Sequence, residues 1–152
     1  MNDRKVLVVD DSALMRRSLR QIFEPEGWQV LEADNGLAAI EHFFVERPSL
    51  VMLDLVMRGM YGLEVLDKLR QIDPQARVIV VSADVQSSSH EMARESGASG
   101  FVIKPFNREQ ILTAVSADKD AAARPKPMFR SSVTASRRWS DRTTMTSPRA
   151  RR

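Results

Sequence analysis

The sequence predicts a doubly wound α/β domain built on a five-stranded parallel sheet. Short, largely apolar runs occur at residues 5–9, 50–53 and 77–81, and such runs are typical of strands that helices cover on both faces. Segments with apolar residues at helical spacing separate the runs. Five alternating strand and helix pairs fit into the first 116 residues or so, and right-handed crossovers between parallel strands leave few possible topologies.

Turn and capping residues set the bounds of each expected element. The strands are expected at residues 5–9, 29–33, 50–53, 77–81 and 101–103. Ser12 and Asn107 are suited to cap the first and last helices, and a proline follows each of the first three helices, where it ends them. The fourth helix, residues 86–96, is rich in polar residues and offers little to bury. We therefore expect it to be weakly anchored.

Polar side chains follow the apolar runs at the points where the strands end. Asp10 and Asp11 follow the first strand and Asp54 follows the third. Ser82 follows the fourth strand and Lys104 follows the fifth. Ligands of open α/β sheets bind at the carboxyl ends of the strands, which parallel strands present at one edge. We therefore expect these five side chains to converge on one cleft.

The expected cleft has the composition of a site for magnesium and a phosphoryl group. Three carboxylates in one place repel one another and require a neutralising charge. Mg²⁺ suits oxygen ligands without His or Cys, and Lys104 and Ser82 add a cation and a hydroxyl for phosphoryl oxygens. Asp54 is the candidate nucleophile for an aspartyl phosphate. A single carboxylate at a strand end more often caps a helix, so the joint occurrence carries this hypothesis.

The chain divides into an acidic part and a basic part. Residues 1–116 carry 13 Lys/Arg and 17 Asp/Glu, whereas residues 117–152 carry 10 and 3. We expect residues 1–116 to form one domain and residues 117–152, where apolar residues are sparse, to be a disordered, solvated tail. The arginine clusters of the tail suit a weak contact with nucleic acid or an acidic membrane. They lack the periodicity expected of specific nucleic-acid recognition.

Composition also excludes several classes of protein. The chain has no Cys, so disulfides and thiolate metal sites are excluded. No apolar run approaches the roughly 20 residues that span a bilayer, and the N-terminus lacks the apolar region of a signal peptide. A cytoplasmic location is therefore expected. The two histidines, His42 and His90, lie on helical patterns away from the cleft and are expected to be exposed.

The motif positions together resemble the receiver domain of bacterial two-component response regulators. They share the order and spacing of that family and are the Asp10–Asp11 pair, Asp54, Ser82–Ala83, Phe101 and Lys104–Pro105. The resemblance covers residues 4–116 and implies a flavodoxin-like (βα)5 receiver fold. The Asp10–Asp11–Ser12 stretch, residues 81–84 and the lack of a second domain are most similar to stand-alone receivers of the chemotaxis type.

The resemblance implies a role for each acidic residue. Asp54 would accept a phosphoryl group from a sensor histidine kinase or a phosphotransfer protein. Asp11, Asp54 and the backbone carbonyl of Val56 would bind Mg²⁺, and Asp10 would assist directly or through water. Lys104, expected to precede a cis peptide bond, would pair with the phosphate. The domain would hydrolyse its own phosphate slowly and would not be a turnover enzyme.

The resemblance also implies how such a domain signals. Ser82 would move toward the phosphate and Phe101 would turn inward, which would repack the face formed by the fourth helix, fifth strand and fifth helix. A downstream protein target would bind that face, and a phosphatase is a further candidate partner. Val56 and Asp84 occupy variable positions that tune dephosphorylation in this family. Arg58 and Tyr61 depart from its common pattern, which has proline and an acidic or polar residue there.

Three alternatives remain open at this point. Phosphohydrolases with an aspartate nucleophile resemble one another in having a second Asp two residues later as general acid and base, where this chain has Val56. A phosphorylation-independent interaction module with the same fold would not need the acceptor residues that are present. A DNA-binding regulator would need an output domain, and residues 117–152 are too few and too polar to form a helix-turn-helix.

Overall fold

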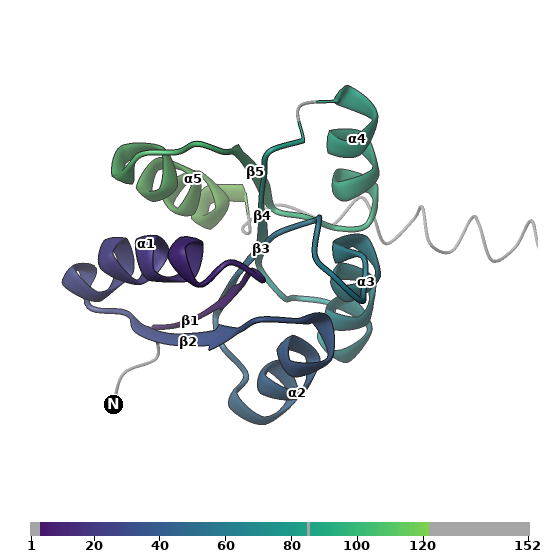
Figure 1. Ribbon diagram of the computed structural model, residues 1–152, viewed down its shortest axis with the longest axis horizontal. Helices are drawn as coiled ribbons and strands as arrows, with labels where there is room; N and C mark the ends of the chain where they lie inside the picture. Colours follow the sequence, from purple (N-terminus) through teal and green to yellow (C-terminus); the bar gives the residue numbers. More distant parts are fainter. Residues whose placement is uncertain (1–3, 85, 122–152) are drawn as a thin grey trace, which may run out of the picture.

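The five predicted strands form one parallel sheet in the computed structural model, which describes residues 4–84 and 86–121 (Figure 1). The strands are β1 (Lys5–Val9), β2 (Gln29–Ala33), β3 (Leu50–Leu53), β4 (Val78–Ser82) and β5 (Gly100–Ile103). The helices are α1 (Ala13–Phe23), α2 (Gly36–Glu46), α3 (Gly62–Ile72), α4 (Ser87–Glu95) and α5 (Arg108–Ala121), with a short 3-10 helix, η1 (Glu24–Glu26), after α1. The strand order is β2-β1-β3-β4-β5. The predicted fold class is confirmed.

Helices cover both faces of the sheet. Figure 1 shows α1 and α5 on one side of the strands and α2, α3 and α4 on the other. Alternate residues of β1 serve the two layers, because Val6 and Val8 pack with Phe23 of α1 whereas Leu7 and Val9 pack with Phe43 of α2. All four residues of β3 are buried. A strand between two helical layers buries both of its faces, which explains the uninterrupted apolar runs.

Polar residues at the helix starts give the chain its turns. The Ser12 hydroxyl accepts a hydrogen bond from the Met15 N–H at 3.3 Å, as predicted for a cap of α1. The Asn107 side chain accepts one from the Gln110 N–H at 2.8 Å at the start of α5. Asn35 caps α2 in the same way. Each cap satisfies an N–H group that has no partner inside its helix, so the chain turns sharply after three strands.

The last helix ends later than the sequence pattern indicated. The domain was expected to end at residue 116, but α5 continues to Ala121. Residues 117–121 lack an apolar face, yet alanine and lysine extend a helix that tertiary packing has already formed. Disorder was predicted for residues 117–152, and the part of that prediction beyond residue 121 lies outside the described residues. None of the described helices is both long and apolar enough to cross a membrane.

The start of α3 is packed directly against the backbone that follows β3. The Gly62 N–H donates to the Leu55 carbonyl at 2.8 Å. A Cβ atom at Gly62 would lie 2.4 Å from the Leu55 Cα and 2.5 Å from the Asp54 carbonyl oxygen. Backbone atoms cannot move aside as the end of a flexible side chain can. The position of the chain just after Asp54 therefore depends on glycine at residue 62.

We predict that Gly62→Ala lowers the free energy of unfolding by about 1–3 kcal/mol, the usual cost of an overpacked site. Urea denaturation measures this change. Gly100→Ala is the matched control, since its Cβ would meet only Ile79 at 3.6 Å, an ordinary contact distance. The control should be as stable as the wild type or slightly more stable. Equal midpoints for the two variants would contradict the close packing described here.

Candidate metal and phosphoryl site

Three of the five strands deliver charged side chains to one edge of the sheet. Asp10 and Asp11 follow β1, Asp54 follows β3, and β1 and β3 are neighbours. Carboxylate oxygens of these three residues lie within 4.8 Å of one another. Lys104 follows β5, and its Nζ atom lies 2.9 Å from Asp10 Oδ2 and 3.4 Å from Asp54 Oδ2. The structure thus brings together three acids and one ammonium group from three separate parts of the sequence.

The Lys104 ammonium group compensates two buried carboxylates. Asp10 and Asp54 are 2% and 6% exposed. Burial opposes a charge on Lys104, but its hydrogen bond to Asp10 and the attraction of Asp54 outweigh this and raise the pKa of Lys104. The Lys104–Pro105 peptide bond is cis, as expected. Lys104 is therefore a fixed cation at neutral pH, held between two acids.

One ammonium group does not fully compensate these carboxylates. Burial raises the pKa of Asp54, and repulsion from Asp10 raises it further. Lys104 and the backbone N–H of Val56, which donates to Asp54 Oδ1 at 3.2 Å, act in the opposite direction without cancelling the effect. The ionised form of Asp54 is thus less favourable in the folded chain than in water. A second cation would relieve this excess of negative charge.

The donor set fits a hard divalent cation. Three carboxylates, each offering one oxygen, form the group, and neither nitrogen nor sulfur ligands belong to it. Oxygen-only sites of this kind suit Mg²⁺, which takes one or two carboxylates and keeps several waters. The Val56 N–H is directed to Asp54. The predicted role of the Val56 carbonyl as a metal ligand stays a prediction.

Asp10 and Asp11 differ in their surroundings. Asp10 Oδ1 accepts a hydrogen bond from the Ser12 N–H at 2.9 Å, which fixes the buried carboxylate. Asp11 is partly exposed, and its Oδ2 accepts from the backbone N–H of Arg58 at 3.3 Å. The Arg58 Nε atom lies 3.7 Å from the same oxygen. From the sequence, Arg58 was noted only because it departs from the family pattern. The position of Arg58 beside Asp11 was not predicted.

Ser82 lies at the carboxyl end of β4 and is fully buried. Its hydroxyl oxygen accepts a hydrogen bond from the Asp84 N–H at 3.2 Å. The Asp84 carboxylate in turn accepts from the Ser89 hydroxyl at 2.5 Å and from the Gln86 N–H at 2.9 Å. Ser82 is therefore connected to the first turn of α4 through the loop that follows β4.

The prediction that His90 is exposed is wrong. His90 is partly buried, and its ring stacks on that of Phe101 with 3.6 Å between the ring centroids. The apolar pattern of α4 gave no signal for this contact, because the partner comes from β5. His42, by contrast, is exposed on α2 as predicted.

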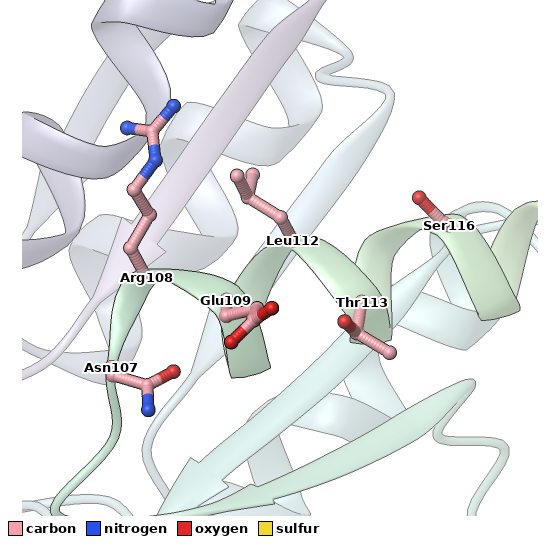
Figure 2. A pocket seen from close by; sticks show the side chains of 6 residues that line it. All are labelled: Asn107, Arg108, Glu109, Leu112, Thr113 and Ser116. Carbon is pink, nitrogen blue, oxygen red and sulfur yellow. The ribbon is translucent and has the colours of Figure 1, made fainter.

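A surface cavity of about 670 Å³ lies elsewhere on the domain. Figure 2 shows its lining side chains, which all come from α5 and from Asn107 just before it. None of the predicted site residues lines this cavity. The predicted site at the strand ends is therefore separate from this cavity.

Comparison with known proteins agrees with this geometry. The sequence matches the response regulator receiver domain family over residues 6–116. It is 39% identical over 112 residues to the chemotaxis protein CheY of Bacillus subtilis, covering 73% of this chain and 93% of the relative. It is 38% identical over 115 residues to sporulation initiation phosphotransferase F of the same organism, covering 76% and 93%.

Solved structures show the same fold. A CheY-like receiver domain protein from Methanospirillum hungatei superposes with a TM-score of 0.74 at 25% identity, covering 78% of this chain and 95% of that one. The response regulator TrrA from Thermotoga maritima, solved in complex with Mg²⁺-BeF, has a TM-score of 0.69 at 31% identity, covering 76% and 98%. The chain therefore belongs to the response regulator receiver domain family, whose CheY-type members are two-component signalling proteins and not turnover enzymes.

Proposed function

We propose that Asp54 accepts a phosphoryl group from a phosphohistidine of a sensor kinase or phosphotransfer protein in a reaction that requires Mg²⁺. One observation carries the proposal: the Lys104 ammonium group lies within 3.4 Å of Asp54 in a cluster of three carboxylates. Positioning and charge stabilisation are the main contributions to phosphoryl transfer. A buried carboxylate beside a fixed cation supplies both.

The transfer itself is a substitution at phosphorus. A carboxylate oxygen of Asp54 forms the new bond, and the bond from phosphorus to the donor nitrogen breaks, so that the histidine leaves with the electron pair. Lys104 would hold the incoming phosphoryl oxygens. Asp11, Asp54 and the Val56 carbonyl would hold Mg²⁺, with Asp10 assisting. The metal would neutralise the charge that gathers between the acids and the phosphoryl group. The Mg²⁺-BeF complex of TrrA supports such a site in this chain.

The proposed output uses Ser82 and Phe101. The Ser82 hydroxyl would leave the Asp84 N–H and bond to a phosphoryl oxygen, and Phe101 would turn inward. Phe101 borders a surface cavity of about 540 Å³ together with other residues of β5 and residues of α5, so it lies within the face that is proposed to repack. Repacking of the face formed by α4, β5 and α5 would then change its affinity for a downstream protein target.

The lifetime of the phosphoryl group is proposed to be long. The Val56 side chain is apolar and 60% exposed, so it cannot orient a water molecule for attack. Both carboxylate oxygens of Asp84 already accept hydrogen bonds, from Ser89 and Gln86. These contacts direct Asp84 toward α4, and we propose slow hydrolysis of the phosphoryl group and a phosphatase as a partner. We propose a cytoplasmic location and no specific nucleic-acid partner.

Incubation with Mg²⁺ and acetyl phosphate is predicted to add the mass of one phosphoryl group to the protein, with acetate as the leaving group. Intact-mass spectrometry should show the adduct on the wild type and on Asp67→Asn, an exposed aspartate of α3 that serves as the control. Asp54→Asn and the wild type in EDTA should show none. An adduct that survives Asp54→Asn would contradict the proposal. Continuous release of phosphate from an ester would instead favour the phosphohydrolase.

Without Mg²⁺, Asp54→Asn is predicted to raise the free energy of unfolding at pH 7. The pKa of Asp54 is raised in the folded chain, so the penalty on its ionised form is complete above the folded pKa. The penalty disappears below the pKa of an aspartate in the unfolded chain, about 3.9. The difference in free energy of unfolding between variant and wild type should therefore narrow as the pH falls. Urea denaturation in EDTA at several pH values measures it.

With Mg²⁺ present, the wild type is predicted to have a higher free energy of unfolding than Asp54→Asn. A ligand that binds only the folded state at one hundred times its Kd stabilises by about 2.7 kcal/mol. The free energy of unfolding of the wild type should rise by close to this amount. That of Asp54→Asn should rise far less, because the variant lacks one of the oxygen ligands. Urea midpoints of both proteins that do not change with Mg²⁺ would contradict the proposed metal site.

A further inference from the structure

The contact between His90 and Phe101 joins α4 to the sheet. The two rings are stacked, with 3.6 Å between centroids and 25° between planes. Few other side chains of α4 anchor the helix to the rest of the domain, because only Ser89 and Ala93 of that helix are buried. Phe101 packs against the small cluster of Leu55, Val80 and Ala93. The stack is therefore a large part of what fixes α4 in the described arrangement.

The same contact carries a built-in cost. The Nε2 atom of His90 is buried and has no hydrogen-bond partner among the described residues. A buried polar atom without a partner destabilises the arrangement that buries it. A ring position that exposed Nε2 to water would remove this cost. Ring stacking thus favours the contact while the buried nitrogen opposes it, which leaves an alternative position of the rings accessible.

Hydrogen bonds link Ser82 to Ser89, the residue that precedes His90 in α4. The Ser82 hydroxyl accepts from the Asp84 N–H at 3.2 Å, and the Asp84 carboxylate accepts from the Ser89 hydroxyl at 2.5 Å. His90 is the next residue of α4. The stack is therefore present in the unphosphorylated arrangement, in which the Ser82 hydroxyl oxygen accepts from the Asp84 N–H of the loop that leads to α4.

We propose that His90 is a positioning residue that holds Phe101 on α4 in the unphosphorylated domain and so opposes occupation of the acceptor site. This inference rests on the proposed phosphorylation of Asp54. A contact made in only one of two arrangements shifts their equilibrium by its own free energy, and it changes the affinity of the acceptor site by the same factor. His90 does not touch the acids itself and acts through Phe101.

Two substitutions should change the acceptor site in opposite directions. His90→Ala removes the stack, which should raise the affinity for beryllofluoride in the presence of Mg²⁺ by roughly two- to tenfold, the range expected for one aromatic pair. His90→Phe keeps a stacked ring and removes the unpartnered nitrogen, which should lower that affinity below the wild-type value. His42→Ala, at the exposed histidine of α2, is the matched control and should equal the wild type.

The experiment is a titration of the full chain with beryllofluoride and Mg²⁺, followed by NMR of ¹³C-labelled phenylalanine rings. The Phe101 signals of free His90→Ala should already lie nearer to those of the loaded wild type. A merely structural role would lower stability in urea without moving the two affinities in opposite directions. Equal affinities for all variants, or a change of the same sign in both, would overturn the inference. A wild type that binds no beryllofluoride would instead overturn the proposed function.

Discussion

The site depends on compensation of carboxylates that the fold forces together. Parallel strands present their carboxyl ends at one edge, so acids that follow β1 and β3 meet whether or not they attract. Lys104 supplies the cation that makes this tolerable, 2.9 Å from Asp10 and 3.4 Å from Asp54. Burial, and then repulsion from Asp10, still raise the pKa of Asp54. A site that is short of positive charge is suited to bind a divalent cation and then a phosphoryl group.

The surrounding structure fixes Asp10 and Asp54 in place but anchors α4 only weakly. Gly62 packs on the backbone next to Asp54, and the Ser12 N–H holds Asp10. Both contacts involve backbone atoms, which have little freedom. On the far side of β4, α4 buries two small side chains and depends on the His90–Phe101 stack. The domain thus combines a rigid acceptor with a weakly anchored helix, and such helices belong to the regions that open most easily.

The fold and the meeting of the charged residues could be predicted from the sequence, because strand direction alone brings Asp10, Asp54 and Lys104 to one edge. The partial burial of His90 could not be predicted, because its stacking partner lies on β5 and the periodicity of a helix carries no information about contacts with another element. The end of α5 was missed because residues 117–121 continue the helix without an apolar pattern. The individual roles of Val56, Ser82 and Phe101 stay predictions, because they concern a loaded state.

A crystal structure of the protein with Mg²⁺ and beryllofluoride tests the central claim most directly. The account predicts one metal ion held by Asp11, Asp54 and the Val56 carbonyl. It also predicts beryllium bonded to a carboxylate oxygen of Asp54, with a fluorine atom within hydrogen-bond distance of the Lys104 Nζ atom. A metal ion bound away from these acids, or beryllofluoride attached to another carboxylate, would contradict it.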